Sequence, residues 1–119
     1  MEEKTVTWRI FAMYILLIIF MLLSGSVSSQ VIVTEFNAGW NKKHDVEWIK
    51  DLEDCDITKV DIAKYPKLQK KHKIVVVPTI IIFKDGEEVE RFQADISFSI
   101  KATRKELQEV INEQLMSDF

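Results

Sequence analysis

The sequence predicts an α/β fold in which helices flank a mixed four-stranded sheet, with a separate apolar helix at the N-terminus. Three observations predict this class. Short β-rich runs alternate with amphipathic runs from residue 31 onward. A hairpin turn, Lys84-Asp85-Gly86, joins two of those runs. An unbroken apolar run stands apart at residues 10–23. The length of 119 residues supports one domain, placed at residues 30–119 after a leader of residues 1–29.

The leader has the pattern of a targeting or anchoring segment. Lys4 and Arg9 precede the apolar run and small polar residues follow it, which is typical of a secretory signal peptide cut near Ser29. The alternative is an uncleaved membrane anchor, because residues 8–27 reach the roughly 20 residues that a transmembrane helix needs. Positive charge before an apolar segment stays in the cytoplasm. Both alternatives therefore place residues 30–119 outside the cytoplasm, either periplasmic or secreted, or membrane-anchored.

The first half of the predicted domain reads as strand, helix and strand. Residues 31–36 (VIVTEF) are β-rich and mostly apolar, as in a buried strand. After a loop around Gly39, residues 44–52 place four apolar side chains on one side of a helix. Residues 57–62 form the next strand, with apolar side chains at 57, 60 and 62. Elements in this order make a parallel strand pair with a right-handed crossover.

The second half adds a short helix and a hairpin. Pro66 opens the helix, because proline fits the first helical turn. Residues 74–83 (IVVVPTIIIF) are continuously apolar, which is typical of a strand buried on both faces. Pro78 cannot donate to a strand ladder, so it separates a loop from the strand at 79–83. Residues 87–93 return from the hairpin turn as an edge strand.

The chain ends in an amphipathic helix. Residues 94–102 alternate apolar and polar side chains, which indicates either a short extra strand or an extended lead-in. Thr103-Arg104-Lys105-Glu106 is a capping box. The helix that follows carries apolar side chains on one face, at positions 107, 110, 111 and 115. The predicted element order is therefore β-α-β-α-β-β-α.

Four features in this order resemble the thioredoxin family over residues 31–115. VIVTEF followed by Asn37-Ala38-Gly39-Trp40 is similar to the family's central strand and the turn to its active-site tryptophan. Residues 59–66 (KVDIAKYP) are similar to the second strand and the next helix start, and the amphipathic C-terminal helix also fits. Val77-Pro78-Thr79 before IIIFKDGEEV is similar to the cis-proline loop, third strand and hairpin, and is the most specific of the four. The resemblance implies a minimal thioredoxin fold with a cis peptide bond before the proline.

The resemblance breaks at the residues that carry the family's chemistry. A WCGPC motif follows the first strand in the family, whereas the matching stretch here is Trp40-Asn41-Lys42-Lys43-His44. Asn41 stands at the position of the attacking cysteine and His44 at that of the resolving cysteine. Thiol–disulfide exchange needs a thiolate and a second thiol, and Asn41 has no ionisable nucleophile. The sequence therefore favours a redox-inactive domain with no catalytic residue.

Loss of the two cysteines leaves a binding surface in place. In the family, the residue before the cis-proline presents backbone groups to an extended peptide, which is recognition by β-strand addition. The resemblance thus implies a protein or extended peptide as the partner, with no cofactor and no small-molecule substrate. The partner-binding residues are then Trp40, Asn41, His44, Val77, Pro78 and Thr79. An equal alternative is that the VPT motif only shapes the fold.

The single cysteine, Cys55, is a candidate reactive thiol and supports an alternative function. In that alternative the protein is an oxidoreductase or redox accessory that uses Cys55 with a partner's thiol. The acidic neighbours Asp54 and Asp56 raise the pKa of a thiol, which favours a partly buried structural cysteine instead. A further alternative is a structural subunit of a membrane assembly, held by residues 8–27.

Composition argues against metal and nucleic-acid binding. Two histidines, His44 and His72, and one cysteine leave few ligands for a metal site, and none is predicted. A formal net charge of -3 argues against a dedicated nucleic-acid binder.

Overall fold

The computed structural model describes residues 30–117, so the signal peptide or anchor predicted within residues 1–29 lies outside the described residues. No helix in the described part of the chain is both long enough and apolar enough to cross a membrane. The described elements are β1 (Val31–Asn37), η1 (Gly39–His44), η2 (Glu47–Asp51), β2 (Asp56–Asp61), α2 (Pro66–Lys71), β3 (Thr79–Lys84), β4 (Glu87–Gln93) and α3 (Arg104–Met116), where η denotes a 3-10 helix.

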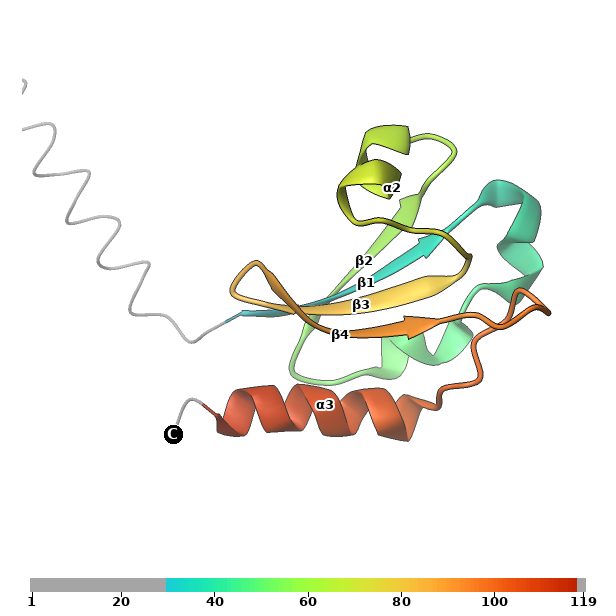
Figure 1. The fold of residues 1–119 in the computed structure, drawn as a ribbon. Helices are drawn as coiled ribbons and strands as arrows, with labels where there is room; N and C mark the ends of the chain where they lie inside the picture. Colours follow the sequence, from blue (N-terminus) through green and yellow to red (C-terminus); the bar gives the residue numbers. More distant parts are fainter. Residues whose placement is uncertain (1–29, 118–119) are drawn as a thin grey trace, which may run out of the picture.

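The strands form one mixed sheet in the order β2-β1-β3-β4 (Figure 1). β1 and β2 run parallel, with Val33 opposite Ile57. β3 runs antiparallel to both β1 and β4, and Thr79 at its start lies opposite Phe36 near the end of β1. The predicted mixed four-stranded sheet is therefore confirmed.

Helices cover both faces of the sheet (Figure 1). α3 lies across one face, where Leu107 packs into the larger hydrophobic cluster together with Ile49 of η2. α2 lies over the other face, above a smaller cluster that includes Phe36. Neighbouring residues of β3 contribute to different clusters, Ile80 to the first and Ile81 to the second, because successive side chains in a strand point to opposite faces. This confirms a strand buried on both faces.

Two predictions from local turn chemistry are also confirmed. Asp85 and Gly86 adopt φ of 52° and 86° between β3 and β4, as a two-residue hairpin turn with positive φ at both positions requires. The N–H of Glu106 donates to Thr103 Oγ1 at 3.2 Å, so Thr103 caps α3.

The predicted α-helix at residues 44–52 is wrong. The structure instead has η1 ending at His44, an extended link at Asp45 and Val46, and then η2. This connection must run back along the whole length of β1 with few residues. A 3-10 helix advances about 2.0 Å per residue against about 1.5 Å for an α-helix, so the tighter helices cover the distance. Ile49 still reaches the core and is 0% exposed.

Residues 94–102 form a lead-in rather than an extra strand. The N–H of Phe98 donates to the Asp95 carbonyl at 3.1 Å, and the N–H of Asp95 donates to the Ser99 carbonyl at 3.3 Å. The Asp95 carboxylate also accepts from the N–H of Ser97 at 2.8 Å. These local bonds compete with strand pairing, so of the two alternatives that the alternating side chains allow, the extra strand does not form.

Candidate functional site

Three loops meet at the end of the sheet where β1 finishes. They are the η1 turn, the loop before β3 and the loop between β4 and α3 (Figure 1). The Val77–Pro78 peptide bond is cis, as the resemblance implies. Asn41 Nδ2 lies 3.4 Å from the Val77 carbonyl oxygen. The structure thus brings residues 40–44, which stand where the family has its WCGPC motif, together with the VPT motif at residues 77–79.

The side-chain amide of Asn41 joins all three loops. Besides the Val77 carbonyl, Nδ2 lies 3.1 Å from Asn37 Oδ1 and 3.2 Å from the Phe98 carbonyl oxygen. Because an amide nitrogen carries two hydrogens, three acceptors share two donors. Asn37 Nδ2 donates in return to the Asn41 carbonyl at 3.2 Å. Asn41 is only 2% exposed, so the side chain that replaces the attacking cysteine acts as a buried structural clasp.

His44 fixes the orientation of this amide. It is the last residue of η1 rather than the first residue of a helix. His44 Nδ1 lies 2.9 Å from Asn41 Oδ1. An amide oxygen can only accept a hydrogen bond, so the network assigns the hydrogen to Nδ1. With its oxygen facing His44, the Asn41 amide must point its nitrogen toward the three acceptors.

Most of the residues predicted to bind a partner are buried. Trp40 is the exception at 67% exposure, and its ring meets that of Phe98 edge-on, with ring centroids 5.5 Å apart and planes at 85°. His44 is half-buried, and Lys42 and Lys43 are exposed. The remaining predicted residues have buried side chains: Asn41, Val77, Pro78 and Thr79.

The backbone of Val77 carries an unused donor. Its N–H has no hydrogen-bond acceptor within residues 30–117, although Val77 is only 4% exposed. The flanking carbonyls are occupied, that of Val76 by Thr79 Oγ1 at 2.7 Å and that of Pro78 by the N–H of Ala94 at 3.0 Å. Buried backbone N–H groups are almost always paired, so the Val77 N–H is a position where an external acceptor would gain a hydrogen bond.

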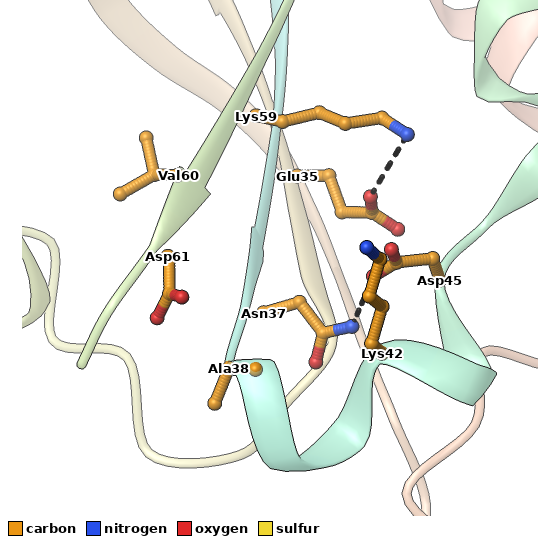
Figure 2. A pocket seen from close by; sticks show the side chains of 9 residues that line it. Glu35, Asn37, Ala38, Lys42, Asp45, Lys59, Val60 and Asp61 are labelled. Carbon is orange, nitrogen blue, oxygen red and sulfur yellow. Dashed lines mark hydrogen bonds and ion pairs between the residues drawn. The ribbon is translucent and has the colours of Figure 1, made fainter. Parts of the chain in front are cut away.

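Sequence reasoning missed Glu35, which is 2% exposed in the middle of β1. Its Oε2 accepts from the N–H of Val46 at 2.6 Å, and Oε1 lies 3.9 Å from Lys59 Nζ (Figure 2). Burial raises the pKa of this carboxyl; the Val46 hydrogen bond lowers it, Asp45 raises it and Lys59 lowers it, each to a smaller extent. A single acidic residue inside an apolar strand was the available signal, since such residues are rarely buried without a partner.

Glu35 lines a pocket of about 250 Å³ beside the ends of β1 and β2. Figure 2 shows Asn37, Lys42 and Asp45 gathered at this pocket, with a hydrogen bond from the Asn37 amide to the Asp45 carboxylate. Asn37 therefore lines the pocket and also exchanges hydrogen bonds with Asn41. Over the described range, no group of three or more histidine, cysteine, aspartate or glutamate side chains is arranged to hold a metal ion.

Cys55 lies at the other end of the sheet. It directly precedes β2, and the parallel register sets Asp56 opposite Ile32, near the start of β1. The thiol is free and half-buried. Burial raises its pKa, and Asp56 and then Asp54 raise it further. Cys55 is thus separated from the VPT motif by most of the length of β1.

Sequence comparisons relate this architecture to thioredoxins. A family model described as thioredoxin matches residues 26–113. Thioredoxin Y1, chloroplastic, of Arabidopsis thaliana is 41% identical over 51 residues, which cover 43% of this chain and 28% of that protein. A thioredoxin of Chlamydia trachomatis is 44% identical over 41 residues, which cover 34% of this chain and 40% of that protein. The chain thus matches less than half the length of these curated relatives.

Solved structures give the same fold. A mutant thioredoxin from Halobacterium salinarum aligns with a TM-score of 0.59 at 23% identity, covering 72% of this chain and 75% of that chain. Schistosoma mansoni thioredoxin aligns with a TM-score of 0.57 at 22% identity, covering 79% of this chain and 85% of that chain. At these identities the two structures show the fold alone, and they confirm the fold that the sequence predicts.

Proposed function

The chain belongs to the thioredoxin family, and from that premise we propose that it is a redox-inactive member that binds an extended peptide or protein segment at the cis-proline loop. The Val77 backbone is the observation that carries the proposal. Its N–H has no acceptor within residues 30–117, and its carbonyl is held only at 3.4 Å by Asn41. In an extended chain the N–H and C=O of one residue can together pair with one residue of an added antiparallel strand. Trp40, exposed next to Asn41, adds an apolar contact surface.

The number of cysteines supports the absence of redox chemistry. The chain has one cysteine, and disulfide exchange by a CxxC site uses two thiols. The alternative that uses Cys55 with a partner's thiol gains no support from its surroundings. Burial, Asp56 and Asp54 raise the pKa of this thiol, so less of the reactive thiolate is present at neutral pH.

The proposed location is outside the cytoplasm. Lys4 and Arg9 before the apolar run support this orientation for a cleaved or an anchored chain. The mass of the N-terminal peptide of the protein isolated from cells separates the two forms. Gln30 as the first residue indicates cleavage, and it also excludes the alternative of a structural subunit held in a membrane by residues 8–27.

Selection of random linear peptides on the full chain tests the binding function. We expect selected peptides to lose about 10-fold or more in affinity for Trp40→Ala, because exposed aromatic anchors dominate such interfaces. Val89→Ala is the matched control, since it removes another exposed apolar side chain, on β4, and should leave affinity unchanged. Binding should also protect the Val77 amide from hydrogen exchange. Peptides that bind Trp40→Ala equally well without protecting Val77 would refute the proposed site.

A further inference from the structure

The loop between β4 and α3 crosses the end of the sheet and contacts the proposed peptide site. The N–H of Ala94 donates to the Pro78 carbonyl at 3.0 Å, which fixes the start of the loop beside the VPT motif. A tight turn follows at Asp95–Ser99, closed by the Phe98 N–H on the Asp95 carbonyl at 3.1 Å. Figure 1 shows this loop beside the turn that follows β1.

Phe98 covers the site with both its backbone and its ring. Its carbonyl oxygen accepts from Asn41 Nδ2 at 3.2 Å. Its ring meets the Trp40 ring edge-on, with centroids 5.5 Å apart. Asn41 and Val77 beneath are 2% and 4% exposed. Asn41 Nδ2 thus links the Phe98 carbonyl to the Val77 carbonyl, so this chain's own loop lies against the residue that carries the unpaired N–H.

The Phe98 ring itself makes few contacts with the rest of the chain. Phe98 has φ of 58°, in the left-handed region that a bulky residue with a Cβ seldom adopts. Its side chain is 44% exposed, and it belongs to neither hydrophobic cluster of the described residues. The turn can thus move away from Trp40 without opening either hydrophobic cluster. The movement breaks the hydrogen bond from Asn41 to the Phe98 carbonyl, and it lets the backbone of Phe98 leave the left-handed region.

We propose that the Asp95–Ser99 turn is an autoinhibitory lid, in which Phe98 occupies the place that an aromatic side chain of the partner takes beside Trp40. This proposal rests on the proposed peptide-binding function. The incoming strand pairs with the Val77 N–H and carbonyl, and its aromatic side chain replaces the Phe98 ring against Trp40. The partner segment is therefore extended and carries a phenylalanine, tyrosine or tryptophan at the residue that reaches Trp40.

A binding titration tests the lid with a defined probe. The probe is an end-blocked peptide of threonine and glutamine with one central phenylalanine, and the control peptide has alanine at that position. An edge-to-face aromatic pair corresponds to a factor of about 2 to 12 in an equilibrium constant. We expect full-length Phe98→Ala to bind the phenylalanine peptide more tightly than the wild type does, by about this factor. The same variant should bind the phenylalanine peptide more tightly than it binds the alanine peptide.

Two further variants separate the ring from the turn. Phe98→Gly also removes the ring but accepts positive φ, so it keeps the turn and should bind the probe more tightly as well. Ile96→Ala removes a side chain of the same turn that is 100% exposed, and it should bind like the wild type. Equal tightening by Ile96→Ala would overturn the assignment to Phe98.

The outcomes distinguish the lid from the site beneath it. Equal binding of the probe to wild type, Phe98→Ala and Phe98→Gly, with protection of the Val77 amide from exchange, overturns the lid and leaves the binding site standing. Weaker binding by both Phe98 variants shows that Phe98 is a wall of the site, which also overturns the lid. Failure of both peptides to bind any of the proteins overturns the proposed function and the lid together.

Discussion

Glu35 Oε2 accepts a hydrogen bond of 2.6 Å from the backbone N–H of Val46. This bond ties the middle of β1 to the extended link between η1 and η2, and so holds the connection that carries Trp40 and Asn41. A neutral amide oxygen at the same position can accept the same hydrogen bond. The negative charge of Glu35 is therefore not needed to hold the connection, and its burial has a cost.

Glu35→Gln should raise the free energy of unfolding at pH 7. Burial raises the pKa of Glu35 above its ordinary 4.5, so the folded state favours the protonated carboxyl. Its stabilising contribution is complete below pH 4.5 and is lost as the pH rises through the raised folded pKa. Each pKa unit of displacement corresponds to about 1.4 kcal/mol, and urea unfolding at neutral pH measures the gain.

The control for this substitution is Glu90→Gln on β4, which removes an exposed carboxylate and should leave stability unchanged. If Glu35→Gln is more stable than the wild type at pH 7 but not at acid pH, ionisation of the Glu35 carboxyl is the cause of the difference. Glu35→Gln unfolding more readily than the wild type at pH 7 would contradict the prediction.

His72→Phe should reduce the loss of stability on mild acidification. The His72 ring lies 5.3 Å from the Phe36 ring and 5.4 Å from the Phe83 ring. Burial lowers the pKa of His72 below its ordinary 6.5, and Lys71 and Arg91 lower it further. The folded state thus favours the neutral ring. Its contribution is complete above pH 6.5 and is lost as the pH falls from there to the lowered folded pKa.

Urea midpoints measured between about pH 7 and pH 5 check this expectation, since histidine ionises in that range. The wild type should lose stability over the interval, and His72→Phe should lose less because phenylalanine keeps the ring contacts without a charge. An equal slope in His72→Phe and wild type would rule out His72 as the source.

Residues adjacent in sequence made most of the fold predictable. The hairpin at Asp85-Gly86 and the cap at Thr103 need only local turn chemistry. The apolar run at residues 80–83 within β3 needs only the rule that a doubly buried strand is apolar on both faces. The segment 44–52 was not predictable in this way, because its apolar spacing fits an α-helix as well as an extended link followed by a short 3-10 helix. The length of the connection decides between these two conformations.

The site was predictable only in part. The resemblance correctly places Asn41 beside the VPT motif. It does not predict that Asn41 is buried, because Phe98, which contacts Asn41, lies 57 residues further along the chain. That contact depends on the left-handed φ of Phe98. No sequence signal marks this conformation, since glycine and asparagine are the residues that usually adopt it. Long-range covering contacts of this kind need the folded structure.

Asn41→Asp should destabilise the fold although the side chains have the same shape. The substitution places a carboxylate oxygen where Nδ2 now donates to the carbonyls of Val77 and Phe98. Those acceptors lose their donor and face a negative charge in a buried position, which we expect to cost about 2–4 kcal/mol. Asn112→Asp on the exposed face of α3 is the matched control and should change stability little. If both variants unfold at the same urea concentration, the Asn41 amide does not hold the three loops together.

The full chain should not reduce insulin disulfides above the buffer rate, and Cys55→Ser should behave identically. The reason is that one half-buried thiol with a raised pKa supplies little thiolate and no resolving partner. Iodoacetamide labelling at neutral pH measures the thiolate directly and should be slower than for a free cysteine. Asp56→Asn should speed the labelling, because it removes the stronger of the two neighbouring negative charges that raise the pKa. Insulin reduction that depends on Cys55 would instead identify this thiol as the working group and restore the single-thiol alternative.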